Sequence, residues 1–488
     1  MYKKFALIGI GSLIGKVIGL LREVILAIFL GTSKIVDGYR ASLTATLLPV
    51  NLLLRDTLNA GFIPIYSSRL KRNKSIYFFQ HTFILLVVLS LILTLLLILF
   101  RNEWSRLLVP GFEEQTQKLV TNFILVMAPG IPFFILSGLF SAVESSNQSY
   151  YLVSFRASLQ SISLILGTLG AFYFSSPLLL GAGFSLAYFL FFFISLRHLF
   201  NKKFVTREYF TAPFNNNKFQ ENIRLLFNTI KPLLILTLII QGNIWVERVT
   251  ASNFDEVGVL ASLEFARTLA ESGIIIISYP LGLISLSTFS GLTKNDITKQ
   301  VVKTVEFQIL LFTPVSIAFI FLSKEVVELI FEYGSFNSKS TAFTAAMLKN
   351  FGFGLIFTSM AYYLVKVYNA IHQNKKVLLF TAVALFIQIG INVCLKDRIG
   401  STVMALSNSI YGMVLFLLFG IDLKLFSMVE KKLLLNCALC VVLFVTFYYL
   451  FLIEIEGNVL KLVLFLFFWL AVSLLNPYIR KKIYSLKK

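Results

Sequence analysis

The sequence has few of the residues that carry chemistry in enzymes. Its 488 residues include three cysteines and three histidines, and charged residues make up only 14% of the chain. The cysteines Cys394, Cys437 and Cys440 lie in apolar stretches, which is typical of small buried or lipid-facing residues. We find no Ser/His/Asp arrangement, phosphate-binding glycine loop or metal-ligand spacing. The sequence therefore indicates no enzyme, no ATP-driven pump, no metal site and no cofactor.

Acidic residues are scarce relative to basic ones, with 24 Asp and Glu against 44 Lys and Arg, which gives a net charge of +20. An excess of this size can indicate nucleic-acid binding. Here, however, the basic residues lie in short loops between apolar stretches, and 57% of the chain is hydrophobic. Basic loops between apolar stretches are typical of a membrane protein's topology. We therefore predict a membrane protein with no nucleic-acid partner.

Fourteen apolar stretches are long enough to cross a bilayer as helices, so the sequence predicts an all-α polytopic membrane protein. They lie near residues 5–30, 41–66, 80–100, 119–143, 151–173, 177–198, 227–248, 257–290, 304–323, 341–368, 376–395, 401–421, 433–452 and 458–476. The longest loop separates six stretches from eight. We therefore divide the chain into an N-terminal part with helices 1–6, a cytoplasmic linker, a part with helices 7–12, and the last two helices with a basic tail. These parts are residues 1–200, 201–226, 227–424 and 425–488.

The distribution of Lys and Arg predicts the orientation of the chain. Basic residues are concentrated in the loops on the side of both termini, including 69–72 and the tail residues 480–482. Because cytoplasmic loops carry an excess of Lys and Arg, both termini are expected in the cytoplasm.

Several apolar stretches contain charges that lipid does not tolerate. A charge at the centre of the bilayer costs about 3 kcal/mol on insertion scales, so it normally faces protein or a water-filled cavity. The first stretch contains Lys16, Arg22 and Glu23, and the second contains Arg55 and Asp56. Arg55 and Asp56 have two interpretations: an internally neutralised structural pair, or a helix that faces a cavity.

The seventh and eighth stretches carry the other charged groups. Glu247 and Arg248 end the seventh stretch, where they are either interfacial residues or part of the same polar path. Glu264, Arg267 and Glu271 share one helical face of the eighth stretch, and either neutralise one another or line a wet passage. Cationic groups on four stretches favour an anionic substrate, because arginine and lysine both bind phosphate. The apolar surroundings suit a substrate that is itself partly lipid.

The charged stretches resemble the MurJ/MviN family of lipid II flippases, within the multidrug/oligosaccharidyl-lipid/polysaccharide exporter superfamily. Residues 15–23 are similar to the family's first-helix motif, and Asp37 follows at the expected place. Residues 246–252 are similar to the motif that ends the seventh helix. The clearest match is Phe-Glu-Tyr-Gly-Ser-Phe at 331–336, and the resemblance covers about 1–420.

The resemblance implies a fold and a function. It implies fourteen helices in two six-helix lobes around a central cationic cavity, with two C-terminal helices that form a groove for a lipid tail. The implied function is to flip a polyprenyl-pyrophosphate-linked saccharide from the cytoplasmic to the outer leaflet of the bacterial inner membrane. The main candidate for this substrate is lipid II. The implied partners are this anionic lipid-linked substrate, membrane lipids and cell-wall synthesis enzymes, with the protein acting as a monomer. The alternatives are another undecaprenyl-linked saccharide or a small exported molecule.

The resemblance also implies roles for individual residues. The substrate-binding residues would be Lys16, Arg22, Arg55 and Arg248. Our own hypothesis from the charges is that Glu23, Asp37, Asp56, Glu247, Glu264 and Arg267 are gating or charge-balancing residues. Lys16 stands where the family usually has arginine. Family members with a sodium site use carboxylates where this chain has Asn228, Gln388 and Asn392, so we predict no sodium site here.

Overall fold

The computed structural model describes residues 2–70, 75–288 and 294–480. It describes all of their side chains except those of 2–13, 53–60, 232–233, 275–277, 279–280, 283–288 and 294–295. Over these ranges the chain is helical and contains no strand, which confirms the predicted all-α class. The chain divides into two compact units, residues 1–261 and 262–488.

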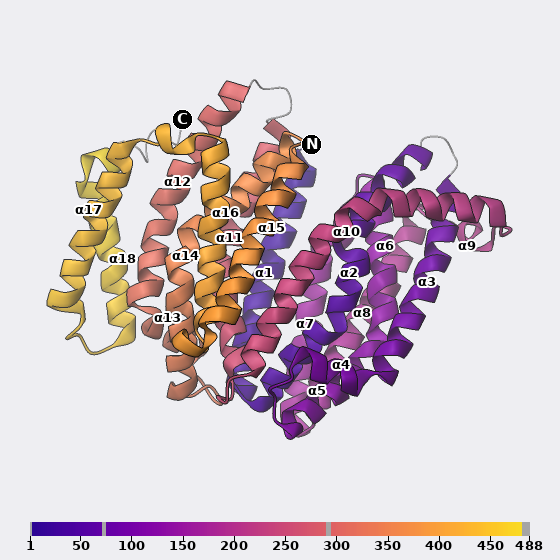
Figure 1. The fold of residues 1–488 in the computed structure, drawn as a ribbon, viewed down its shortest axis with the longest axis horizontal. Coiled ribbons are helices and arrows are strands. Elements are labelled where there is room, and N and C mark those ends of the chain that lie inside the picture. The colour runs from indigo at the N-terminus through magenta and orange to yellow at the C-terminus, as the bar shows by residue number, and fades with distance from the viewer. Residues whose placement is uncertain (1, 71–74, 289–293, 481–488) are drawn as a thin grey trace. The chain divides into compact units, whose positions relative to one another are not determined.

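Unit 1 contains the helices of the first half of the chain (Figure 1). They are α1 (Tyr2–Leu30), α2 (Lys34–Leu70), α3 (Ser75–Leu99), α4 (Arg101–Leu108), α5 (Glu114–Met127), η1 (Ala128–Gly130), α6 (Ile131–Ser146), α7 (Tyr151–Tyr173), α8 (Leu178–Asn201), α9 (Glu208–Thr211) and α10 (Asn216–Ser252). The next helix, α11 (Val259–Thr288), begins in unit 1 and continues in unit 2.

Unit 2 contains the remaining helices. They are α12 (Lys294–Phe321), α13 (Ser323–Phe331), α14 (Ser338–Ala370), α15 (Asn374–Ile399), α16 (Val403–Asp422), η2 (Leu425–Ser427), α17 (Lys431–Phe447), η3 (Tyr448–Leu452) and α18 (Asn458–Leu475). The η3 segment is a π-helical turn that continues α17.

The described residues contain eleven helical segments that are long and apolar enough to cross a membrane. The chain is therefore a multi-pass membrane protein, as predicted. Helices α1, α2 and α11 are not among the eleven, although each has at least 29 residues. All three contain the charged residues described above, and the count of fourteen spans stays a prediction.

The order of the elements repeats along the chain. Three long helices are followed by a short one, and then by three further long helices or helix pairs. The short helices α4 and α13 have 8 and 9 residues, and each follows the preceding helix after a single residue. Helix α10 packs within unit 1 against α2 and α3. The domain boundaries predicted from the longest loop stay a prediction.

Polar contacts join the first turns of α10 to α2 and α3 within unit 1. The Arg69 Nη1 of α2 donates to the Asn222 Oδ1 of α10 over 2.5 Å. The Nδ2 of the same asparagine lies 2.8 Å from the Nδ1 of His81, which is fully buried in α3. Three helices are therefore joined where α10 begins, within the stretch that the sequence assigned to the linker.

Each unit also has a carboxylate that joins the ends of three helices. In unit 1 the buried Glu144 of α6 accepts hydrogen bonds from the backbone N–H groups of Tyr151 and Leu152, at 3.1 and 2.8 Å. It also lies 3.0 Å from the Nε2 of His198 in α8. In unit 2 Asp422 of α16 accepts from Lys376 and Tyr368 over 2.6 Å each. Each of these two carboxylates therefore holds the ends of adjacent helices together.

We expect Glu144→Gln to lower the stability of the folded protein. The amide nitrogen of glutamine cannot accept a hydrogen bond, so it leaves a donor of α7 or α8 without its partner. A buried donor without a partner costs about 1–3 kcal/mol. The apparent melting temperature of the purified protein in detergent is expected to fall. Glu114→Gln is the matched control, because Glu114 is exposed and pairs with the exposed Lys118; equal melting temperatures for both variants would contradict the prediction.

Candidate functional site

The charged residues of α1 form an ion-pair cluster inside unit 1. Helix α1 packs closely against α7, where a Cβ on Gly15 would lie 3.1 Å from the Cβ of Ala157. Two turns further along α1, Glu23 is fully buried and Arg22 keeps 24% of its side chain exposed. The Nε of Arg22 donates to the Oε1 of Glu23 over 3.1 Å. The structure therefore pairs two of the residues that the sequence singled out.

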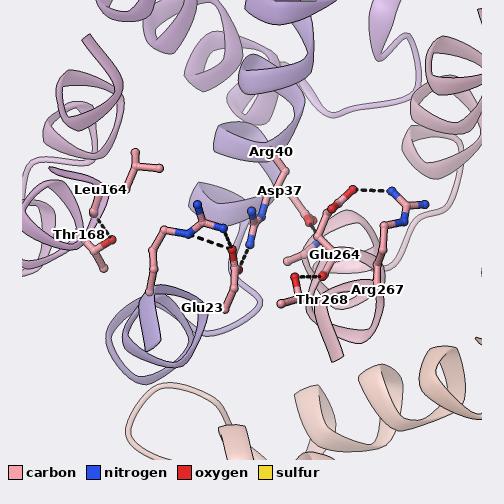
Figure 2. Close-up of polar contacts among 10 residues, drawn as sticks. Glu23, Asp37, Arg40, Leu164, Thr168, Glu264, Arg267 and Thr268 are labelled. Atoms are coloured by element: carbon pink, nitrogen blue, oxygen red, sulfur yellow. Dashed lines mark hydrogen bonds and ion pairs between the residues drawn. The ribbon is translucent and has the colours of Figure 1, made fainter. Parts of the chain in front are cut away.

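A second arginine, which sequence reasoning missed, completes this cluster. Arg40 of α2 binds the other carboxylate oxygen of Glu23, Oε2, through its Nη2. Figure 2 shows the side chains of Glu23 and Arg40 directed toward each other. Arg22, Glu23 and Arg40 together are called the ion-pair triad below. Its charges add up to +1, and Glu23 contacts a different guanidinium with each oxygen.

The other cations assigned to substrate binding from the sequence differ in their surroundings. Lys16 lies on α1 and is exposed in unit 1. The side chains of Arg55 and Asp56 lie outside the described residues, although the backbone of both belongs to α2.

Arg248 of α10 is buried and connects α10 to α2. Its Nε donates to the Oγ1 of Thr44 over 2.9 Å, and its Nη1 donates to the Oε1 of Glu247 over 3.3 Å. A buried arginine therefore again lies beside a buried carboxylate. The pair lies near the end of α10, where the indole Nε1 of Trp245 donates to the backbone oxygen of Leu107 over 3.0 Å.

Asp37 of α2 holds the turn between α10 and α11. Its Oδ2 accepts from the backbone N–H of Gly258 over 2.6 Å, and its Oδ1 accepts from that of Ala261 over 2.8 Å. A carboxylate on the first N–H groups of a helix satisfies donors that have no partner within the helix. Gly258 has a φ of +91°, and a Cβ there would lie 2.5 Å from the backbone oxygen of Thr32. Residues 252–261, called the α10–α11 corner, are thus fixed to the start of α2.

Glu264 and Arg267 of α11 pair within their own helix. In unit 2 the Nη1 of Arg267 donates to the Oε1 of Glu264 over 2.8 Å (Figure 2). Both side chains are 17% exposed, and their spacing of three residues suits a pair on one helical face. This contact fits the interpretation in which these charges neutralise each other.

The amides that stand at the family's sodium-ligand positions lie in two places. Asn228 is exposed on α10, whereas Gln388 and Asn392 are buried one turn apart on α15. The Oδ1 of Asn392 accepts a hydrogen bond from the Oγ of Ser407 in α16 over 2.7 Å. Among the described residues, no three His, Cys, Asp or Glu side chains are grouped to hold a metal ion.

Unit 1 therefore holds several basic side chains beside acidic ones. Arg22 and Arg40 contact Glu23, and Arg248 contacts Glu247. Such pairs allow charges to lie inside a membrane protein, where an isolated charge is costly. An anion that takes the same guanidinium N–H groups must compete with these carboxylates.

The family model described as "Lipid II flippase MurJ" matches residues 26–473. The chain belongs to the MurJ lipid II flippase family. Members of this family are transporters, and the chain is therefore a transporter and not an enzyme.

Individual MurJ relatives are distant in sequence but match most of the chain. The probable lipid II flippase MurJ of Thermotoga maritima is 22% identical over 410 residues, which cover 84% of this chain and 82% of the relative. The lipid II flippase MurJ of Thermosipho africanus is 24% identical over 428 residues, with 85% and 84% covered.

Solved structures show the same fold. A structure of lipid II flippase MurJ in an inward closed conformation matches with a TM-score of 0.82 at 20% identity, over 96% of this chain and 98% of that one. An inward-facing multidrug resistance transporter of the MATE family matches with a TM-score of 0.66 at 16% identity, over 83% and 97%. The family match confirms the resemblance to MurJ inferred from the motifs, and the MATE structure shares the fold.

Proposed function

We propose that this chain flips lipid II, the lipid-linked precursor of peptidoglycan, from the cytoplasmic to the outer leaflet of the bacterial inner membrane. The MurJ family match over residues 26–473 carries this proposal. The multi-pass helical fold supports it, because a flippase must offer a polar head group a path through the hydrocarbon. Alternating access supplies this path without making or breaking a covalent bond.

The pyrophosphate of the substrate is proposed to bind the cations of unit 1. Arg22 is the first candidate, since it combines partial exposure with a position beside a buried carboxylate. Lys16 on the same helix and Arg248 on α10 add charge, and Arg55 is kept as a fourth candidate. A guanidinium binds two phosphate oxygens at once, whereas lysine acts as a point charge.

Acidic residues are proposed to balance these cations when no substrate is bound. Glu23 and Glu247 contact arginines in the present conformation, and Asp56 is assigned the same role from the sequence. The substrate's negative charges would then replace the carboxylates as partners of the arginines. On α11, Glu264 and Arg267 would neutralise each other's charge.

Asp37 is proposed to act as a gate residue. Its two hydrogen bonds hold the α10–α11 corner against α2 in the present conformation. Opening this corner would require both bonds to break, so Asp37 would contribute to the balance between conformations.

The proposed topology places both termini in the cytoplasm. The loops expected on the same side of the membrane as the termini are the ones rich in Lys and Arg, and such loops are typically cytoplasmic. The protein is proposed to act as a monomer, with cell-wall synthesis enzymes as partners that use the flipped lipid.

The direct test is a bacterium depleted of its own lipid II flippase and supplied with this chain. Labelled lipid II should become accessible on the outer leaflet when the wild-type chain is expressed, and should stay inside with an empty vector. The amount of the chain in the membrane fraction is measured separately to check insertion, and the melting temperature of the purified protein is measured to check folding. If the inserted chain leaves lipid II inside, the lipid II assignment is wrong, and other undecaprenyl-linked saccharides become the substrates to test.

A further inference from the structure

Arg40 gives the buried carboxylate of Glu23 a second cation that comes from another helix. Arg22 is the sequence neighbour of Glu23 on α1, whereas Arg40 reaches the same carboxylate from α2. Each arginine binds a different oxygen: Arg22 binds Oε1 and Arg40 binds Oε2. The two contacts therefore do not compete for one acceptor, and either can be lost while the other remains.

The two arginines differ in how accessible they are. The side chain of Arg22 is 24% exposed, whereas that of Arg40 is 8% exposed and that of Glu23 is 1% exposed. An arriving anion can therefore reach Arg22 far more easily than Arg40. Arg40 is enclosed with the carboxylate it binds.

This difference in exposure matters when Arg22 leaves Glu23 to bind a substrate. If Arg22 were the sole partner of Glu23, its departure would leave a buried carboxylate alone, and an isolated buried charge is strongly destabilising. That penalty would oppose substrate binding. With Arg40 on Oε2, Glu23 stays paired after Arg22 leaves, and the cost of the exchange is lower.

We infer that Arg40 is a positioning residue, which keeps Glu23 charged and in place while Arg22 moves between Glu23 and the phosphates of the substrate. This inference rests on the proposed function and deepens it, since it separates a mobile arginine from a fixed one. Arg22 contacts the substrate, and Arg40 acts through Glu23.

The charge balance of the ion-pair triad determines how its variants should behave. Removing Arg40 alone leaves Glu23 with a single cation, so Arg22 is bound more tightly to it and is less available to the substrate. Removing Arg40 and the charge of Glu23 together restores the net charge of +1 at this position, and it releases Arg22. The second change should therefore repair the first.

The test compares Arg40→Gln with the double variant Glu23→Gln/Arg40→Gln. Purified proteins are assayed for binding of a fluorescent lipid II analogue, and flipping is measured in the depleted cells. Arg40→Gln is expected to reduce both by about tenfold, and the double variant is expected to recover most of this loss, because contacting charged groups act as a coupled unit. Arg197→Gln on α8 is the matched control, because Arg197 is exposed and carries the same charge.

Three results would overturn the inference. A double variant as weak as Arg40→Gln would show that Arg40 contacts the substrate itself. Wild-type binding and flipping by Arg40→Gln would show that the second cation is not needed. A lower melting temperature in both variants, with flipping lost in proportion, would show a purely structural role. If wild-type protein itself does not flip lipid II, the proposed function fails, independently of the comparison between these variants.

Discussion

Arg22→Ala is expected to abolish flipping while the protein remains folded in the membrane. Arg22 is the partly exposed member of the ion-pair triad, so it is the guanidinium that an anionic head group can reach. Alanine removes a cation that binds two phosphate oxygens at once. Glu23 keeps Arg40 as its partner in this variant, so the cost to folding is small compared with the loss of the substrate contact. The measurement is the fraction of labelled lipid II that is accessible on the outer leaflet of depleted cells.

Two further variants show whether charge or geometry matters at position 22. Arg22→Lys keeps the charge but loses the planar fork, so partial activity is expected. Arg197→Ala removes one positive charge from α8 at an exposed position and should behave like wild type. Normal flipping by a correctly inserted Arg22→Ala protein would show that the pyrophosphate binds elsewhere.

Much of the fold could be predicted because lipid limits the choice of structure. A backbone in hydrocarbon must satisfy its own hydrogen bonds, so long apolar stretches become helices. Each predicted span overlaps a long helix or a pair of consecutive helices. The short helices α4 and α13 were missed because their charged residues dilute the apolar signal over a window of membrane length. The first turns of α10 were missed because a helix that continues beyond the apolar stretch has no hydropathy signal.

The site could be predicted only in part, because hydropathy shows that a charge lies in the membrane but not which group it meets. Arg22 and Glu23 stand out within an apolar stretch. Arg40 lies one residue before the predicted second span and so resembled a flanking residue. Helix α2 in fact begins at Lys34, which places Arg40 nearly two turns inside the helix, next to α1.

Asp37 shows a second limit of sequence reasoning. Its charge suggested a gating or charge-balancing role, for which a side-chain cation would be the natural partner. In the structure its carboxylate binds backbone N–H groups of Gly258 and Ala261, more than 200 residues away along the chain. Backbone groups are the same at every residue, so no sequence pattern identifies them as partners.

Asp37→Asn is expected to loosen the α10–α11 corner. Asparagine has nearly the same shape, but its amide nitrogen cannot accept a hydrogen bond, and its neutral side chain no longer interacts with the positive end of α11. Loss of such a cap costs about 1–2 kcal/mol, and 1.4 kcal/mol changes an equilibrium tenfold. If the bond exists only while the corner is closed, the open population should rise by about tenfold.

The opening of the corner can be measured without measuring transport. Ser252 is buried in the closed corner, where its Oγ accepts from the backbone N–H of Gly111 over 3.3 Å. In a protein freed of its three native cysteines, Ser252→Cys should react slowly with a membrane-impermeant maleimide. Asp37→Asn should speed this labelling about tenfold, the ratio expected from the shift in population. Asp255→Asn removes the same charge from an exposed position in the same corner and should leave the rate unchanged. Equal rates in all three proteins would mean that Asp37 does not hold the corner closed.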